Sequence, residues 1–215
     1  RVFKLQKQIY RASQNANKPL VRKLQRLLMK SYMAKCLAIR KVCQENKGKS
    51  TAGIDGKKAP TPQTRFKLIR ELGKLPTGKP LRRVWIPKPG KNEKRPLGIP
   101  VIYDRAMQAL VKMALEPEWE AKFEPNSYGF RPGRSAHDAI AKLYNDALLV
   151  PKWVLDADIK GCFDNINHQA LLSKIDSSPS FKRMIKSWLK AGILDQGIFA
   201  ETDSGTPQGG VISPL

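Results

Sequence analysis

Two aspartates, Asp156 and Asp158, have the clearest potential for chemistry in this sequence, because they lie two residues apart in the segment 153–159. Apolar side chains occupy the alternate positions of that segment, which predicts a β-strand with a core face and a carboxylate face. Strand interiors are normally depleted in aspartate, and two close like charges need a cation or another partner. A hard divalent cation such as Mg²⁺ would suit them. On pattern alone, a surface strand whose carboxylates pair with lysines is equally acceptable.

An aromatic side chain, Phe163, follows Asp158 by five residues, beyond the turn-rich stretch Lys160-Gly161. That spacing is short enough for the ring to line the same cleft as the carboxylates. Packing in the core is the simpler interpretation of the ring when no other motif is considered.

The cysteines and histidines do not suggest a metal centre. The three cysteines fit no zinc spacing and no disulfide framework, so we expect reduced thiols in a cytosolic or organellar protein. The two histidines lack partners at ligand spacing and are interpreted as helix-start or packing residues. These residues are Cys36, Cys43, Cys162, His137 and His168.

Positive charge dominates the composition. The 215 residues include 40 Lys and Arg against 18 Asp and Glu, and residues 1–50 alone hold 14 basic residues and one acid, Glu45. A basic arm of this density is typical of nucleic-acid binding, whereas a merely soluble basic surface or an acidic membrane surface explains it less well. The sequence contains no run of about 18 apolar residues, so no membrane span is predicted. The chain opens on Arg1 rather than Met, so we expect it to begin inside a longer reading frame.

The periodicity of apolar residues predicts a mixed α+β fold with two lobes. A long basic amphipathic helix is expected over 19–44, followed by a loop to Pro62. Turn residues at 89–92 between two strand-like segments predict a hairpin with a basic tip, over 82–88 and 95–99. Further helices are expected from about Tyr103 to the neighbourhood of Pro117, over 135–149, over 168–175 and over 181–191.

Six segments, taken together and in order, resemble the reverse transcriptase of group II introns, the intron-encoded maturase. Each segment alone would be weak evidence for this family, but the six occur in the family's order and cover nearly the whole chain. They are 50–56 (STAGIDG), 84–89 (VWIPKP), 95–100 (RPLGIP), 126–135 (NSYGFRPGRS), 155–166 (LDADIKGCFDNI) and 205–215 (GTPQGGVISPL).

The resemblance implies a right-hand polymerase, with a basic helical RNA-binding extension over 1–50, fingers over 51–150 and an incomplete palm over 151–215. In such enzymes Asp158 would be the first metal-binding, catalytic aspartate, and the backbone carbonyl of Ile159 would also face Mg²⁺. Phe163 would be the steric gate, whose ring leaves no room for a 2′-hydroxyl and so favours dNTP over NTP. Asp156 would support the site without being a ligand.

The same resemblance assigns binding roles to further residues. Lys88 and Arg95 would grip the incoming triphosphate, for which charge-assisted donors are suited. Gln208 would contact the nucleotide near its 3′-hydroxyl, while Gly209 and Gly210 would let backbone approach nucleotide or template closely. Contacts to template or RNA phosphates are expected from Arg131 and Arg134, and from the arm residues Arg22, Lys23, Arg26 and Lys30.

The implied function is an RNA-directed DNA polymerase and splicing maturase in a bacterial cytoplasm or an organelle. Its partners would be group II intron RNA, an RNA template, a DNA primer or target, and dNTP, with a homodimer left open. The family's Tyr-Ala-Asp-Asp motif is absent from these 215 residues, so we expect no polymerisation by them alone. The alternatives are a splicing-only RNA-binding maturase and a reverse transcriptase linked to retrons or CRISPR loci.

Overall fold

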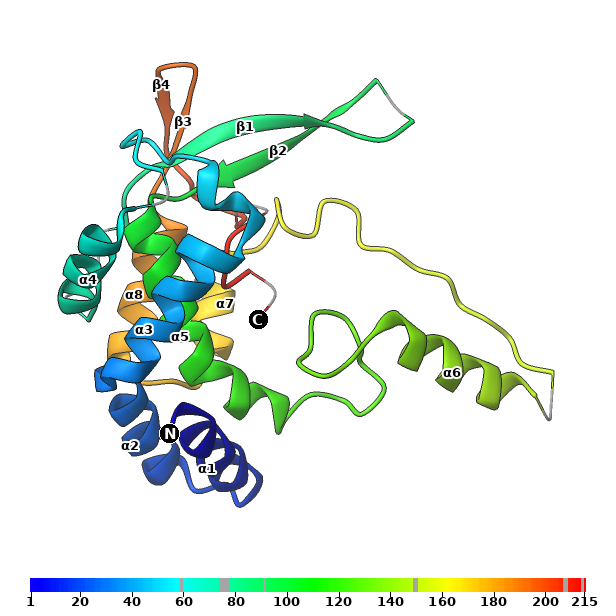
Figure 1. Cartoon of the computed structure of the whole chain (residues 1–215). Coiled ribbons are helices and arrows are strands. Elements are labelled where there is room, and N and C mark those ends of the chain that lie inside the picture. Colours follow the sequence, from blue (N-terminus) through cyan, green and yellow to red (C-terminus); the bar gives the residue numbers. More distant parts are fainter. Residues whose placement is uncertain (59, 74–77, 91, 149–150, 207–208, 214) are drawn as a thin grey trace.

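The computed structural model describes residues 1–215 except 59, 74–77, 91, 149–150, 207–208 and 214. A body of helices lies below a small sheet, and a long excursion of the chain leaves that body (Figure 1). In chain order the elements are α1 (Val2–Gln14), α2 (Lys18–Lys30), α3 (Tyr32–Arg40), a π-helical turn (Lys41–Glu45), a 3₁₀ turn (Lys47–Ser50), α4 (Pro62–Glu71), β1 (Leu81–Pro87), β2 (Lys94–Ile99), α5 (Ile102–Glu120), α6 (Ala136–Ala147), α7 (His168–Lys174), α8 (Pro179–Leu189), β3 (Ile193–Asp195) and β4 (Ile198–Ala200).

Helix α5 is the centre of the hydrophobic core, and the helices α1, α2 and α3 pack against it. Its predicted apolar stripe is buried, including Met107 and Leu110, which are fully inaccessible. Pro117 lies inside the last part of α5 and has no N–H to offer the carbonyl of Met113. The side chain of Gln6, on α1, supplies that donor at 3.1 Å. α5 therefore continues past Pro117, and the hydrogen bond from Gln6 joins α1 to α5.

The basic N-terminal helix is interrupted, which corrects the prediction of one helix over 19–44. Ser31 has ψ 122° and ends α2, and its side chain accepts from the backbone N–H of Ala34 to cap α3. A serine oxygen can satisfy a free backbone donor at a helix start, and this favours a new helix over a continuous one. Residues 2–14, for which the sequence made no prediction, form α1.

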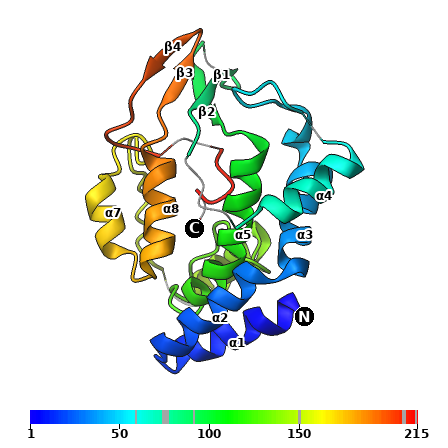
Figure 2. The ribbon, with the colours of Figure 1, turned by 90° about the vertical axis from the view of Figure 1, so that its left-hand side faces the viewer.

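The sheet has the strand order β2-β1-β3-β4. β1 and β2 form the predicted antiparallel hairpin, with Arg82 opposite Ile99 and Pro87 opposite Lys94. β3 joins β1 in parallel through Leu81 and Ile193, so the hairpin is anchored at its base while its far end extends beyond the body (Figure 1). Figure 2 shows β3 and β4 at the same end of the molecule as the hairpin, above α8.

The segment 153–159 is not a strand, which corrects the prediction of a central strand. It runs as irregular backbone beyond α6, away from the helical body (Figure 1), and its predicted core residues Trp153 and Leu155 are 103% and 90% exposed. A strand needs a neighbouring strand to take up its backbone hydrogen bonds. Within the described residues the four strands pair only with one another, so the alternating pattern has no partner.

Helix α6 confirms the prediction over 135–149, with a reciprocal capping box between Ser135 and Asp138 at its start. The helices predicted over 168–175 and 181–191 are present as α7 and α8. None of the helices in the described part of the chain is long and apolar enough to span a bilayer.

Candidate nucleotide and nucleic-acid site

The hairpin of β1 and β2 brings the two predicted triphosphate-binding residues together. Its register sets Ile86 opposite Arg95, and Lys88 lies two residues beyond Ile86, so alternation puts Lys88 and Arg95 on one face. Arg95 is exposed. The Nζ of Lys88 donates to the Oε2 of Glu93 at 2.5 Å, and this hydrogen bond lowers the pKa of Glu93. The face therefore carries two cations and one carboxylate.

A buried arginine ties the base of the hairpin to the preceding loop. Arg105, on α5, donates to the carbonyls of Pro100, Gly48 and Thr51 at 2.7, 2.9 and 2.6 Å. Arg82, on β1, donates to the carbonyl of Ala52 at 2.9 Å. The loop that carries the motif STAGIDG is thereby held against both α5 and the hairpin.

Phe163 lines an apolar cavity of about 440 Å³. The cavity lies between α5, α7 and α8 and the last residues of the chain, and Thr206 and Gly210 also line it. The backbone N–H of Thr206 donates to the carbonyl of Phe163 at 2.7 Å. The predicted steric gate and the predicted nucleotide loop are thus in direct contact through two residues that are 43 positions apart in sequence.

Gly209 lies against the hairpin. It has φ +93°, and a Cβ built there would stand 3.7 Å from the side chain of Leu97 on β2. The left-handed conformation favours glycine at this position. Gln208, the predicted nucleotide contact, lies outside the described residues.

Asp158 and Ile159 lie on the irregular segment and are exposed, and their assignment as Mg²⁺ ligands stays a prediction. In the described part of the chain, no group of three or more His, Cys, Asp or Glu could hold a metal ion. A single exposed carboxylate does not fix a divalent cation that prefers six or more oxygens. The described residues therefore supply at most part of a Mg²⁺ site, and no catalytic step through the metal is derived from them.

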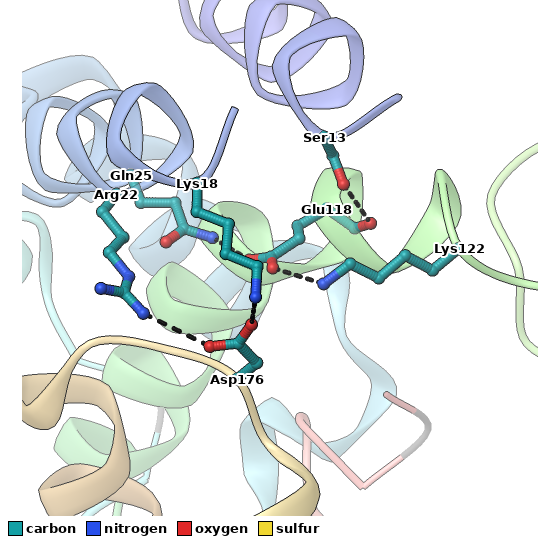
Figure 3. Close-up of polar contacts among 7 residues, drawn as sticks. All are labelled: Ser13, Lys18, Arg22, Gln25, Glu118, Lys122 and Asp176. Atoms are coloured by element: carbon teal, nitrogen blue, oxygen red, sulfur yellow. Dashed lines mark hydrogen bonds and ion pairs between the residues drawn. The ribbon is translucent and has the colours of Figure 1, made fainter. Parts of the chain in front are cut away.

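The four predicted RNA contacts of the basic arm are exposed on the outer face of α2: Arg22, Lys23, Arg26 and Lys30. Among the described residues, two of the four have a protein partner, and one of these is Arg26, whose Nε donates to the backbone carbonyl of Arg22 at 3.3 Å. Arg22 forms an ion pair with Asp176 at 3.3 Å, and Lys18 contacts the other oxygen of that carboxylate at 2.6 Å (Figure 3). Asp176 belongs to the turn between α7 and α8, and these cations lower its pKa.

A second polar group stands beside this ion pair (Figure 3). The buried Glu118 accepts from Gln25 at 2.7 Å and from Lys122 at 2.6 Å, and its backbone carbonyl accepts from Ser13. These contacts join α1 and α2 to the end of α5. The basic face is therefore held to the helical body by polar contacts at the N-terminal half of α2.

The two arginines of the 126–135 motif have different environments. Arg131 is 8% exposed and its guanidinium donates to Glu120 at 2.7 and 3.0 Å and to the carbonyls of Glu124 and Ser127. These contacts hold the loop of Arg131 in place, and the prediction that Arg131 touches the template stays a prediction. Arg134 is exposed and lies over the ring of Tyr128 at 5.6 Å.

Three residues that shape this site were not predicted. Glu93 and Asp176 are acidic partners of predicted phosphate-binding cations, and Arg105 fixes a loop more than 50 positions away. Only Glu93 was near enough in sequence to be found, because it faces Lys88 across a predicted two-strand turn.

Two regions of the chain match models of known protein families. Residues 1–72 match the N-terminal domain of reverse transcriptase, and residues 86–215 match reverse transcriptase (RNA-dependent DNA polymerase). The chain therefore belongs to the reverse transcriptase family. Within that family it is of the group II intron type, as the motif resemblance predicted.

Two curated relatives are similar to this chain. Protein YkfC of Escherichia coli (strain K12) is 37% identical over 207 residues, which are 90% of this chain and 54% of YkfC. The group II intron-encoded protein LtrA of Lactococcus lactis subsp. cremoris is 40% identical over 176 residues, 79% of this chain and 29% of LtrA. The chain thus spans about half of the first relative and less than a third of the second.

A solved structure shares the fold. A chain of the partial Cas6-RT-Cas1–Cas2 complex aligns with a TM-score of 0.54 over 89% of this chain and 32% of its own length. Sequence identity is 23%, so this likeness supports the fold alone. It confirms the α+β arrangement of reverse transcriptase fingers and palm.

Proposed function

We propose that this chain is the fingers and the beginning of the palm of an RNA-directed DNA polymerase that also acts as an intron maturase. The single observation that carries the proposal is the hairpin face with Lys88 and Arg95. Two cations on one face of a projecting hairpin suit a triphosphate, and Arg can bind phosphate oxygens in pairs. A protein that only binds RNA has no need of such a face beside a family nucleotide loop.

The three regions have separate roles in this proposal. Residues 1–50 bind intron RNA and template through the outer face of α2, by phosphate contacts that need no base readout. Residues 51–150 form the fingers, which hold the dNTP triphosphate. Residues 151–215 begin the palm, where Phe163 excludes a 2′-hydroxyl and Gln208, Gly209 and Gly210 meet the nucleotide.

Mg²⁺ is proposed as the cofactor because polymerases of this family use divalent metal ions. When bound, such a cation would stabilise the attacking and leaving oxygens of nucleotidyl transfer. Asp158 would offer it one carboxylate and Ile159 a backbone carbonyl. The family membership also supports a DNA primer or target as a further partner, and a bacterial cytoplasm or an organelle as the compartment.

Primer extension tests the proposal. The protein at its natural length is given a DNA primer on an RNA template with dNTP and Mg²⁺. Asp158→Asn should abolish cDNA synthesis and leave the affinity for intron RNA unchanged, whereas the matched variant Asp156→Asn should keep most of the activity. A normal cDNA yield from Asp158→Asn would contradict the proposal. RNA binding without any synthesis by the wild type would favour a splicing-only maturase.

A further inference from the structure

Two short segments whose paired residues are 37 to 43 positions apart in sequence are joined by backbone contacts next to the cavity of Phe163. The N–H of Gly205 donates to the carbonyl of Ile166 at 2.8 Å, beside the bond from Thr206 to Phe163. Asn167 and Ser204 form an isolated antiparallel bridge between the same segments. The end of the first palm motif and the start of the nucleotide loop therefore have one fixed register.

The side chain of His168 adds a contact to this register. It begins α7, is 6% exposed, and its Nε2 lies 2.6 Å from the carbonyl oxygen of Gly205. A carbonyl can only accept, so Nε2 carries the proton in this contact. The other ring nitrogen, Nδ1, is buried without a partner among the described residues. The one hydrogen bond that this ring makes here is thus directed at Gly205.

Gly205 is the residue that the contact requires. It has φ +76°, and a Cβ there would stand 2.7 Å from the carbonyl oxygen of Asp164 and 2.9 Å from that of Phe163. A side chain would therefore push the two segments apart, and only glycine allows this close approach. The hydrogen bond of His168 stabilises the close approach of the two segments, and the absence of a side chain at Gly205 makes that approach possible.

We propose that His168 is a positioning residue of the nucleotide site, which fixes the ring of Phe163 against the loop that starts at Gly205. The inference rests on the proposed function of the chain as a polymerase. Phe163 and Thr206 line the same cavity, so the register that His168 secures sets the space beside the ring. A ring that discriminates between sugars must be held within a fraction of an ångström by its neighbours.

A histidine that merely packed in the interior would act differently. Its replacement would lower stability without changing which nucleotide is chosen. Two quantities therefore separate the two roles: the KM for dNTP and the preference for dNTP over NTP. Both should change if His168 positions the nucleotide site, and neither reports on global stability.

The test compares His168→Phe, which keeps the bulk and loses the donor, with His168→Gln, which restores an N–H donor. The protein at its natural length is assayed with RNA template and DNA primer. We expect His168→Phe to raise the KM for dNTP and lower the dNTP preference, each about tenfold, while kcat and RNA affinity stay within about twofold. His168→Gln should recover most of both quantities, and His137→Phe, at an exposed histidine, should match the wild type. Unchanged KM and preference in His168→Phe, or no recovery in His168→Gln, would overturn the proposal.

A second readout does not depend on polymerase activity. Amide hydrogen exchange at Gly205 and Thr206 should be about ten times faster in His168→Phe than in the wild type, with no change at Val84 in β1. Equal exchange at Gly205 would overturn the proposal even if synthesis were slowed. If the wild type makes no cDNA, the proposed function fails, and the exchange rates still decide whether His168 holds the segments. Should His168→Phe not fold, Gly205→Ala tests the same register from the opposite side, and its preference for dNTP should fall likewise.

Discussion

Arg22 and Asp176 form an ion pair across 154 positions of sequence, with 3.3 Å between the guanidinium Nη2 and the carboxylate Oδ1. The contact joins α2 to the turn between α7 and α8, and Lys18 binds the same carboxylate. Asp176 therefore neutralises part of the basic face that we propose for RNA. An RNA phosphate and Asp176 would compete for the same two cations.

Removal of this carboxylate should strengthen RNA binding. Asp176→Asn frees Lys18 and Arg22, so RNA affinity should rise about threefold and the slope of log affinity against log salt should steepen by about one unit. The measurement is a filter-binding titration at several salt concentrations, with Asp203→Asn, another exposed aspartate, as the control. Weaker RNA binding by Asp176→Asn would contradict this competition and would show that the ion pair positions α2 for RNA binding.

The remaining cations of α2 should carry the salt dependence. Deleting residues 1–50 would be a poor test, because α1, α2 and α3 supply part of the core around α5. Exchanging the exposed cations for glutamine leaves the core intact and should flatten the salt slope by about 0.7 to 0.9 for each lost phosphate contact. The test variant replaces Lys23, Arg26 and Lys30, and the control variant replaces Arg183, Lys186 and Lys190 at α8. An equal loss of salt slope in the control variant would contradict a specific role for α2.

The hairpin face should control the affinity for dNTP. Lys88→Ala or Arg95→Ala removes a charge-assisted donor, so the KM for dNTP should rise about tenfold while RNA affinity changes little. Glu93→Gln removes the carboxylate that holds Lys88 and should lower that KM by about twofold. Steady-state primer extension measures the KM of all three variants. An unchanged KM for dNTP in all three would show that the hairpin is not part of the nucleotide site.

Asp104 provides a pH test of the fold. Burial raises the pKa of this carboxyl, whose Oδ2 accepts from the backbone N–H of Lys79 at 3.1 Å. A raised pKa in the folded state means that the protonated form stabilises the fold below the unfolded pKa, and this stability is lost as pH rises through the folded pKa. At pH 7, Asp104→Asn should therefore raise Tm, by on the order of 2 °C. The gain should vanish below about pH 4, where the wild-type carboxyl is protonated in both states.

The fold could be predicted from sequence wherever local pattern sufficed. The stripe of α5, the capping box of α6 and the turn of the hairpin are all set by residues within a few positions of one another. The alternation over 153–159 is local as well, but a strand also needs a partner, and none of the described strands pairs with it. Ser31 shows the converse, because one side-chain cap divided a pattern that otherwise indicated a single helix.

The site was predicted in its residues better than in its contacts. The motifs identified Lys88, Arg95 and Phe163, and the structure puts the first two on one face and the third against the nucleotide loop. The contacts of Arg131 could not be predicted because its partner Glu120 lies on another element, and a motif does not show whether an arginine also stabilises its own loop. The role of Asp176 likewise depends on tertiary packing alone.

The most direct test of the central claim is single-nucleotide incorporation on an RNA template by the protein at its natural length, with the matching dNTP or NTP. The account predicts that the wild type prefers dNTP by more than about a hundredfold and that Phe163→Ala reduces this preference at least about tenfold, with RNA affinity unchanged. An equal preference in Phe163→Ala and the wild type, or no incorporation of either nucleotide by the wild type, would contradict a deoxynucleotide site in this chain.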